Sequence, residues 1–489
     1  MAPHSKLSSS HRVAVVGGGL LGLTLALRLR GEGGPDAPAV TVYEAAPDLG
    51  GLASAWRIGG RAQGAADVPV AGQPGDVSTD ETVWDRFYHV ILLSDLNVRR
   101  LLDDLGLADR LRWNTTRTGF FTDGRLVSMS NSLEFLRFPP LGLVDKLRLG
   151  GTIFHASRLK DWRRLEGIAV TDWLRRLSGR HTFEKIWLPL LRAKLGENYV
   201  NANAAFIWAT ISRMYAARRS GLKTEMFGYV DGGYATILAA LGEALRARGV
   251  EVICNAAVAR IEPGEKGSTI VLADGTHRDF DATVMALPAS LVPGLCPGLA
   301  LEERQRLSAI TYHGIVCASV LLKRPLGGYY VTNITDEGLP YTAVIEMTAL
   351  VDRERFGGHT LAYLPRYLTQ IDPFWELTDA EVEVRFRAGL ARMYPHLRPD
   401  DIVAFQVARA RNVMALPTLN YSTTLMPAVE TSRRGLFLVS SAQIPDGTLN
   451  VNETIGLAER AVPKILAFLA GQPGGIPLQP VGRQPGGKQ

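Results

Sequence analysis

RVAVVGGGLLGLTLALRLR, at residues 12–30, and VTVYE, at residues 40–44, are the stretches that decide the fold. The β-branched run at 12–16 is typical of a buried parallel strand, and the Leu-rich segment at 20–30 is typical of a helix with a cationic end. The second β-branched run ends at Glu44. The order strand, glycine turn, helix and strand predicts a βαβ unit at the start of an α/β domain.

The turn between this strand and helix, GGGLLG at residues 17–22, fits the pattern G-x-G-x-x-G. Gly17 would permit the tight turn, Gly19 the approach of backbone to a diphosphate, and Gly22 the close packing of helix on strand. Glu44 follows 22 positions after Gly22. A carboxylate there can accept hydrogen bonds from ribose hydroxyls and would repel a 2′-phosphate. The pattern therefore predicts a dinucleotide site, and the alternative is a Gly-rich turn without a ligand.

A second glycine pair lies just after the acidic strand end, in EAAPDLGGLAS at residues 44–54. This combination resembles the FAD-binding signature of the flavin amine oxidase superfamily. Three later stretches resemble the family's returning strand, next strand-turn and closing flavin motif: NAAVARI at 255–261, VMALPA at 284–289 and GLFLVSSAQIPDGTLNVNETIG at 435–456. The resemblance implies FAD, held without a covalent link.

Four further segments are similar to the branch that contains protoporphyrinogen oxidase, phytoene desaturase and related oxidoreductases: DRFYHVILLSD at 85–95, RTGFFTDG at 117–124, GLPYTAVIEMT at 338–348 and LAYLPRY at 361–367. The resemblance implies an FAD-dependent oxidoreductase that removes a hydride from an apolar or amphipathic small organic substrate. Because no second G-x-G-x-x-G motif occurs, we expect dioxygen or a quinone as the electron acceptor.

The motif and the resemblance together assign the cofactor contacts to Gly17, Gly19, Leu20, Leu21, Gly22, Glu44, Ala45, Gly50, Gly51, Leu52, Val258, Ser441, Val451 and Asn452. Some of these positions depart from the family pattern. Leu52 stands where an Arg usually touches the phosphates, Ser440-Ser441 replaces a Gly-Asp pair, and Val451-Asn452 replaces a Gly-Ala pair. Asn450 and Asn452 would either stabilise negative charge on the reduced flavin or cap the closing helix.

The candidates for chemistry follow the long Gly-rich loop and the strand pattern near the middle of the chain. Tyr88 and His89 are the candidate catalytic residues, with His89 as a proton acceptor or as a packed, structural histidine. The candidate substrate contacts are Glu346, Tyr363, Arg366 and Arg411. For these side chains the alternative is an ordinary place on a strand face or at the surface.

Charge is unevenly distributed along the chain. The net charge is +6, but residues 141–225 hold 16 Lys and Arg against 7 Asp and Glu, a net of +9, which leaves −3 for the rest. This basic segment indicates either a solvated face or contact with an anionic substrate or a membrane surface, and no motif for nucleic acid accompanies it. The three cysteines have no metal-ligand spacing, and no apolar run is long enough to cross a bilayer. We expect a cytoplasmic protein that can contact a membrane, of unknown oligomeric state.

Strand and helix patterns of the first type return after interruptions, which predicts a discontinuous α/β FAD-binding Rossmann-like domain with an inserted α+β substrate domain. The expected segments are FAD-binding at 12–95, 231–295 and 431–470, helical substrate-binding at 96–230, strand-rich substrate-binding at 296–430, and a disordered tail at 471–489.

Three functions compete at this point. The leading hypothesis is the oxidoreductase described above. The alternatives are a non-redox flavin isomerase or sugar-nucleotide mutase, and a flavoprotein subunit or redox-inactive scaffold, to which the departures at residues 52 and 441 give some weight.

Overall fold

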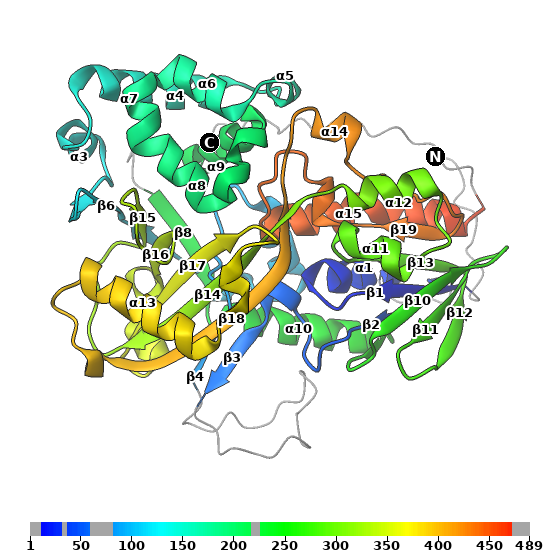
Figure 1. Cartoon of the computed structure of the whole chain (residues 1–489). Coiled ribbons are helices and arrows are strands. Elements are labelled where there is room, and N and C mark those ends of the chain that lie inside the picture. Colours follow the sequence, from blue (N-terminus) through cyan, green and yellow to red (C-terminus); the bar gives the residue numbers. More distant parts are fainter. Residues whose placement is uncertain (1–10, 32–36, 59–81, 217–224, 472–489) are drawn as a thin grey trace.

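The computed structural model describes residues 11–31, 37–58, 82–216 and 225–471 of the 489-residue chain. The tail after residue 471 that the sequence predicts to be disordered lies outside these residues. Two units stand side by side (Figure 1). A parallel sheet with its helices forms one unit, and a seven-stranded sheet with a group of helices above it forms the other.

The parallel sheet has five strands in the order β19-β13-β1-β2-β9, and all of its pairings are parallel. Its strands are β1 (Arg12–Val16), β2 (Ala39–Tyr43), β9 (Glu251–Ile253), β13 (Ala282–Met285) and β19 (Leu436–Leu438). This is the strand order of a dinucleotide-binding half, in which ligands bind beyond the carboxyl ends of the strands near β1. The three sequence segments assigned to FAD each contribute strands to it.

Helices cover one face of this sheet. They are α1 (Leu20–Arg30), α2 (Leu96–Asp104), α10 (Gly233–Ala247) and α15 (Val451–Leu469), and their apolar sides form one core with the strands. The sequence assigned residues 96–104 to the substrate domain, but α2 packs on α15 because Val98, Leu101 and Leu102 belong to this core.

The other face carries a small antiparallel sheet and two short helices. These elements are β10 (Val258–Pro263), β11 (Ser268–Leu272), β12 (His277–Phe280), α11 (Val292–Leu295) and α12 (Leu301–Ser308). Cys296, Leu299 and Leu307 pack into the core beneath them. The first unit therefore extends past residue 295, where the sequence placed its end.

The second unit is built on a mixed sheet in the order β18-β14-β17-β16-β15-β6-β7. Its strands are β6 (Thr118–Thr122), β7 (Arg125–Ser128), β14 (Tyr312–Leu322), β15 (Val331–Ile334), β16 (Ala343–Glu346), β17 (Thr360–Leu368) and β18 (Ile402–Ala415). Helix α13 (Asp379–Met393) packs on one face. The opposite face packs against strands at 82–85 and 225–230 and the segment at 87–92, which lie between the two units.

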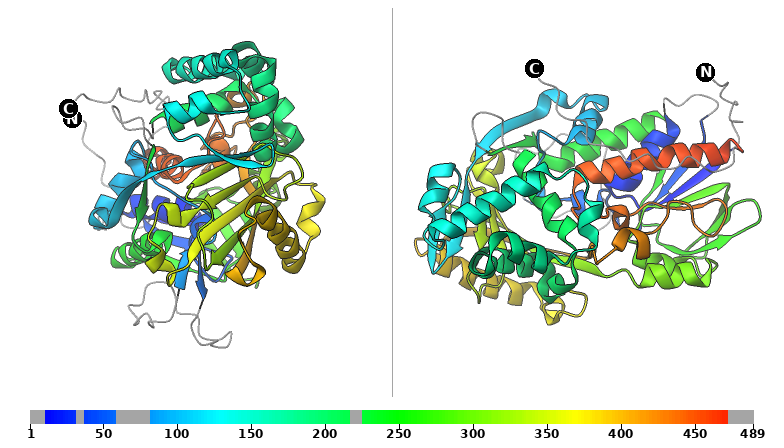
Figure 2. Two further views of the ribbon diagram at one scale, coloured as in Figure 1. Left: turned by 90° about the vertical axis from the view of Figure 1, so that its left-hand side faces the viewer. Right: turned by 90° about the horizontal axis from the view of Figure 1, so that it is seen from above.

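The helical group stands beside the parallel-sheet unit, as the view from above shows (Figure 2). It contains α3 (Ser132–Arg137), α4 (Leu143–Arg158), α5 (Arg163–Glu166), α6 (Val170–Ser178), α7 (Arg180–Thr182), a π-helical turn (Phe183–Trp187), α8 (Leu188–Leu195) and α9 (Ala204–Ala216). Two strand pairs connect the units: β3 (Ala55–Ile58) with β4 (Thr82–Asp85), and β5 (Leu111–Thr116) with β8 (Glu225–Val230). A short helix, α14 (Tyr421–Thr424), precedes β19. Among the described residues, no helix has the length and apolar character needed to span a bilayer.

Candidate functional site

The three glycines of the turn after β1 are required for two different reasons. A Cβ on Gly17, whose φ is +113°, would lie 2.6 Å from the carbonyl oxygen of Ala286, and one on Gly22 would lie 1.9 Å from that of Gly17. A Cβ on Gly19 would meet nothing nearer than the Gly50 oxygen at 4.0 Å. Packing therefore requires the first and third glycines, whereas the second leaves backbone accessible to a diphosphate.

Glu44 ends β2 beside this turn. Its Oε2 accepts a hydrogen bond from Gly18 N at 2.7 Å, and its Oε1 accepts one from Ala46 N at 2.8 Å. Gly50 N donates to Gly18 O at 2.9 Å, which joins the two glycine loops. A carboxylate has about four acceptor positions, so Glu44 is held in place and keeps acceptor capacity for ribose hydroxyls.

The N-terminus of α1 has no side-chain cap, because its N-cap residue is Gly19. The amides of the first helical turn, at Leu20 and Leu21, therefore face the turn without a capping side chain, which is the arrangement that binds phosphates. Leu52, in the place of the usual Arg, packs instead against a buried aromatic cluster. The residues present fit an adenine dinucleotide whose diphosphate is held by backbone amides.

The two asparagines of the closing motif have different roles, and only Asn450 caps the closing helix. Asn450 is the N-cap of α15, and its side-chain oxygen accepts from Glu453 N at 3.0 Å. The side-chain oxygen of Asn452 accepts from Asn97 N at 2.8 Å, and Asn97 Nδ2 donates to Asn452 O at 3.0 Å. Asn452 thus fastens α2 to α15. Ser441 begins the 3₁₀ turn that follows β19, and Val258 begins β10.

Tyr88 and His89 follow β4 and lie between the two units. The hydroxyl of Tyr88 lies 2.7 Å from that of Tyr367 on β17, and burial raises the pKa of Tyr88 to about 12. His89 Nδ1 lies 4.0 Å from Asp85 Oδ2. Burial lowers the pKa of His89 to about 4 and raises that of Asp85 to about 7, so we do not regard them as an ion pair at neutral pH. Among the described residues His89 Nδ1 has no hydrogen-bond partner, so the neutral imidazole can accept a proton or a hydrogen bond.

Strand alternation separates the predicted substrate contacts. On β17, Tyr363 lies on the side of Tyr88 and donates its hydroxyl hydrogen to Asp85 O at 2.8 Å. Arg366, an odd number of positions away, points to the opposite side, where α13 packs. The two side chains therefore do not line one cavity, which corrects their expected grouping.

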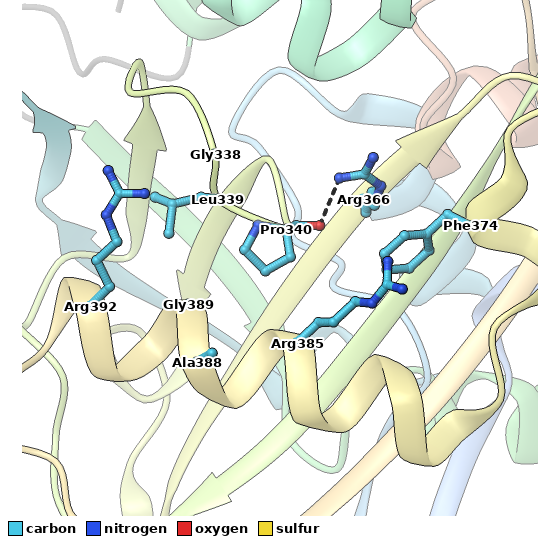
Figure 3. A pocket seen from close by; sticks show the side chains of 9 residues that line it. All are labelled: Gly338, Leu339, Pro340, Arg366, Phe374, Arg385, Ala388, Gly389 and Arg392. Atoms are coloured by element: carbon cyan, nitrogen blue, oxygen red, sulfur yellow. Dashed lines mark hydrogen bonds between the residues drawn. The ribbon is translucent and has the colours of Figure 1, made fainter.

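Arg366 instead lies at the edge of a groove of about 500 Å³ between α13 and the loop at 338–340 (Figure 3). Its Nη1 donates to Pro340 O at 3.0 Å, and its guanidinium lies 4.6 Å from the centre of the Phe374 ring. Arg385 and Arg392 on α13 line the same groove. The groove lies on the sheet face away from Tyr88, so it is separate from the site between the units.

Glu346 and Arg411 also lie on the α13 side of the sheet. Glu346 is buried, and its carboxylate accepts from the amides of Leu326, Gly327 and Gly328 at 3.0, 3.0 and 2.8 Å. Arg411 lies 4.7 Å over the Trp375 ring. The alternative of an ordinary structural role on a strand face accounts for both residues, in place of the expected substrate contact.

Lys194 on α8 is a site residue that the sequence reasoning missed. Its Nζ lies 3.7 Å from the centre of the Tyr367 ring, and burial lowers its pKa to about 7. His313 on β14 lies nearby, fully buried, with its Nε2 3.5 Å from Asn198 Nδ2. A sequence signal did exist, because Lys194 stands among the buried Leu191 and Leu195 on the apolar side of its helix.

The cysteines are free, with Cys296 and Cys317 buried and Cys254 half-buried. Within the described ranges no group of three or more His, Cys, Asp or Glu side chains could hold a metal ion.

Comparison with known proteins gives relatives by sequence and by structure. Coproporphyrinogen III oxidase of Mycobacterium tuberculosis (strain H37Rv) is 29% identical over 323 residues, which cover 60% of this chain and 64% of that protein. The Mycobacterium leprae protein of the same name is 27% identical over 301 residues, 58% of this chain and 60% of that protein. The chain thus matches less than two thirds of the length of these relatives.

Two solved structures show the same fold at low identity. A proposed protoporphyrinogen oxidase from Exiguobacterium sp. 255-15 has a TM-score of 0.69 at 18% identity, over 93% of this chain and 98% of that one. Putrescine oxidase bound to putrescine has a TM-score of 0.64 at 17% identity, over 94% and 99%. These likenesses show that the chain shares the mixed α/β fold of these two proteins.

The family model described as "Flavin containing amine oxidoreductase" matches residues 22–446, from the glycine turn to the closing motif. This span covers the greater part of the chain and contains Glu44, the second glycine pair and the Tyr88–His89 segment. The chain therefore belongs to the flavin-containing amine oxidoreductase family, as an FAD-dependent oxidoreductase.

Proposed function

We propose that this enzyme oxidises a porphyrinogen-class tetrapyrrole by removing hydride, with dioxygen or a quinone as the acceptor. One observation carries the proposal: Leu52, beside the dinucleotide loop, packs in the same cluster as Tyr88, Tyr363 and Tyr367. The cofactor site therefore adjoins an aromatic sheet face, which suits a flat, apolar substrate body. The name of the mycobacterial relatives, coproporphyrinogen III oxidase, supports this substrate class.

FAD supplies the hydride acceptor when it is bound. The side chains of the protein would bind and orient the substrate. Tyr88 keeps its proton at neutral pH and can donate a hydrogen bond, while the neutral His89 can accept the proton that leaves with each oxidation. In this proposal the seven-stranded sheet and the helical group form the substrate domain, interrupting the segments that build the parallel sheet.

An anaerobic reaction tests the proposal. FAD-loaded protein is mixed with coproporphyrinogen III, and the flavin absorbance and porphyrin fluorescence are recorded. We expect the flavin to bleach, porphyrin to form, and admitted dioxygen or quinone to restore the flavin colour. A flavin that dithionite bleaches but coproporphyrinogen III leaves oxidised would contradict the proposal.

A non-redox alternative remains distinguishable, because reduced UDP-galactopyranose mutase shares the fold with a TM-score of 0.68 at 13% identity, over 96% of this chain and 100% of that one. Such an activity needs reduced flavin and consumes no acceptor. Measured consumption of dioxygen or quinone in proportion to product would exclude it.

We further infer that the helical group contacts a membrane surface. Large apolar side chains are exposed along α3 and α4, among them Leu143 at 69%, Leu147 at 68% and Phe154 at 56%. Basic residues surround them, including Lys146 and Arg158 on the same helix. An amphipathic helix with exposed apolar residues and flanking cations suits an anionic lipid surface.

A further inference from the structure

We propose that Lys194 binds a carboxylate of the substrate, at the side of the aromatic cluster away from the dinucleotide loop. The inference rests on the proposed function and specifies its substrate further: the molecule oxidised here carries an acidic group next to an apolar, aromatic-binding body.

The position of Lys194 places it at the interior of the molecule. Helix α8 packs against β17, and Lys194 Nζ lies 3.7 Å from the centre of the Tyr367 ring. The Tyr367 hydroxyl lies 2.7 Å from that of Tyr88, which belongs to the cluster that contains Leu52. Lys194 is therefore connected to the cofactor side through the tyrosine pair.

The side chains of Lys194 and the tyrosine pair are only partly buried. Lys194, Tyr367 and Tyr88 are surrounded by protein, yet each keeps part of its surface accessible. Side chains that are packed into a core lose that surface. These three side chains keep it, so a ligand can contact them.

The ammonium of Lys194 has no counter-charge in the part of the chain that the structure describes. Burial lowers the pKa of Lys194, and no carboxylate of the described residues is among the causes of that shift. The neighbouring Arg192 differs, because it pairs with Glu197 at 3.1 Å. The nearby His313 has a pKa lowered to about 4 and is neutral. A lysine that is desolvated without an anion is costly, and an incoming carboxylate would offset that cost.

The chemistry of the surroundings favours a carboxylate over a neutral polar group. The ring of Tyr367 stabilises the cation from one side and accepts no conventional hydrogen bond, so the N–H groups of Lys194 remain available to a ligand. The rings of Tyr88 and Tyr367, which are only partly buried, offer contact to an apolar body. A molecule that provides both a carboxylate for Lys194 and an apolar body for the tyrosine rings is an amphipathic acid.

Substitution of Lys194 tests the inference with paired ligands. Coproporphyrinogen III and its methyl ester share one apolar body and differ in charge. We expect Lys194→Met to raise KM for the acid by about 10- to 100-fold, the range of a charge-assisted hydrogen bond, and to leave KM for the ester unchanged. Lys194→Arg should retain most of the affinity for the acid. Flavin content should be equal in all variants.

Lys185→Met is the matched control. Lys185 lies on the π-helical turn before α8, is exposed, and has its Nζ 3.8 Å from Asp123 Oδ1. It should leave both KM values unchanged. Equal KM for the acid in wild type and Lys194→Met, or equal losses for acid and ester, would overturn the inference.

Equilibrium binding separates this inference from the proposed reaction. Quenching of tryptophan fluorescence by coproporphyrin III and by its ester requires no turnover. Preference of wild type for the acid that Lys194→Met abolishes supports the inference even if no oxidation occurs. Wild-type protein that binds neither ligand would overturn the inference, and one that oxidises the porphyrinogen without an acid preference would leave only the proposed function standing.

Discussion

Gly19 and Gly22 occupy one turn but face different surroundings, which makes them a matched pair. A Cβ on Gly22 would collide with the Gly17 carbonyl, whereas one on Gly19 would enter open space. We expect Gly22→Ala to lower the free energy of unfolding of the apo-protein by about 3 kcal/mol. Gly19→Ala should leave that stability unchanged and weaken FAD binding more than about tenfold, because its methyl group holds the diphosphate off the amides.

Urea unfolding of the apo-proteins and fluorescence titration with FAD measure the two effects separately. Unchanged FAD affinity in Gly19→Ala would show that the diphosphate does not approach this turn.

Asp85 gives a prediction for pH dependence. Burial raises its folded-state pKa from 3.8 to about 7, so the folded protein keeps a proton that the unfolded chain releases near pH 4. The free energy of unfolding therefore falls as pH rises through the window from about 4 to 7. Burial lowers the pKa of His89 to about 4, so His89 changes the stability in the opposite direction. Its contribution to the free energy of unfolding is present above about pH 6.5 and is lost as the pH falls below that value.

Asp85→Asn removes the carboxyl ionisation and keeps the His89 contribution. We expect the stability of the variant relative to wild type to increase by about 1–3 kcal/mol between pH 5 and pH 8, measured by urea unfolding. Asp103→Asn, at an exposed position on α2, serves as the control. Parallel pH curves for wild type and Asp85→Asn would refute the assignment.

At this scale the cofactor turn could be predicted from sequence because each glycine acts through its own backbone and its immediate neighbours. Lys194 could not be assigned in the same way. Its environment comes from Tyr367, which lies far away in sequence, and only the fold brings the two together.

Among the elements, β17 shows how strand alternation determines the sheet face on which each side chain lies. Alternation along β17 places Tyr363 and Arg366 on opposite faces, and this much follows from the sequence alone. Which face adjoins the cofactor depends on how the sheet packs against the other unit, so the sequence could not decide between them. The α2 helix illustrates the same limit, since its contact with α15 is made across the fold by Asn97 and Asn452.

Glu346, at the end of β16, tests whether a buried carboxylate serves structure or substrate. It accepts three amide hydrogens from the loop at 326–328. We expect Glu346→Ala to lower the free energy of unfolding by about 2–3 kcal/mol, because buried amides lose their acceptor. The KM for substrate should stay unchanged in the fraction that folds. A rise in KM without a loss of stability would contradict the structural role and show that Glu346 contacts the substrate.

For the whole molecule, the strand pattern predicted that the segments of the parallel sheet are separated along the chain. The exact limits of those segments depend on packing: residues 96–104 and 296–308 join the first unit because their apolar side chains complete its two cores. Amphipathic patterns indicate that a helix has an apolar side, but they do not identify the core that receives it.

The exposed apolar residues of α4 carry the prediction for the molecular surface. Wild-type protein should co-sediment with vesicles of phosphatidylglycerol and phosphatidylcholine, and Leu143→Glu with Leu147→Glu should reduce the bound fraction several-fold, because charge is costly to bury in lipid. Val384→Glu is the control, since Val384 is 69% exposed on α13, outside this helix. Equal binding of the double variant and the control would refute the membrane contact.

The position of β19 at the edge of the parallel sheet has a consequence for synthesis. Residues 436–438 form that edge, and α15, which follows, packs along α1 at the opposite end of the sequence. A ribosome must therefore synthesise the chain through residue 469 before α1, near the start of the sequence, acquires α15 as its neighbour. A nonsense codon upstream of residue 436 would leave α1 without its late partner, and the shortened product should be cleared by cellular proteases before it acquires the yellow colour of a flavoprotein.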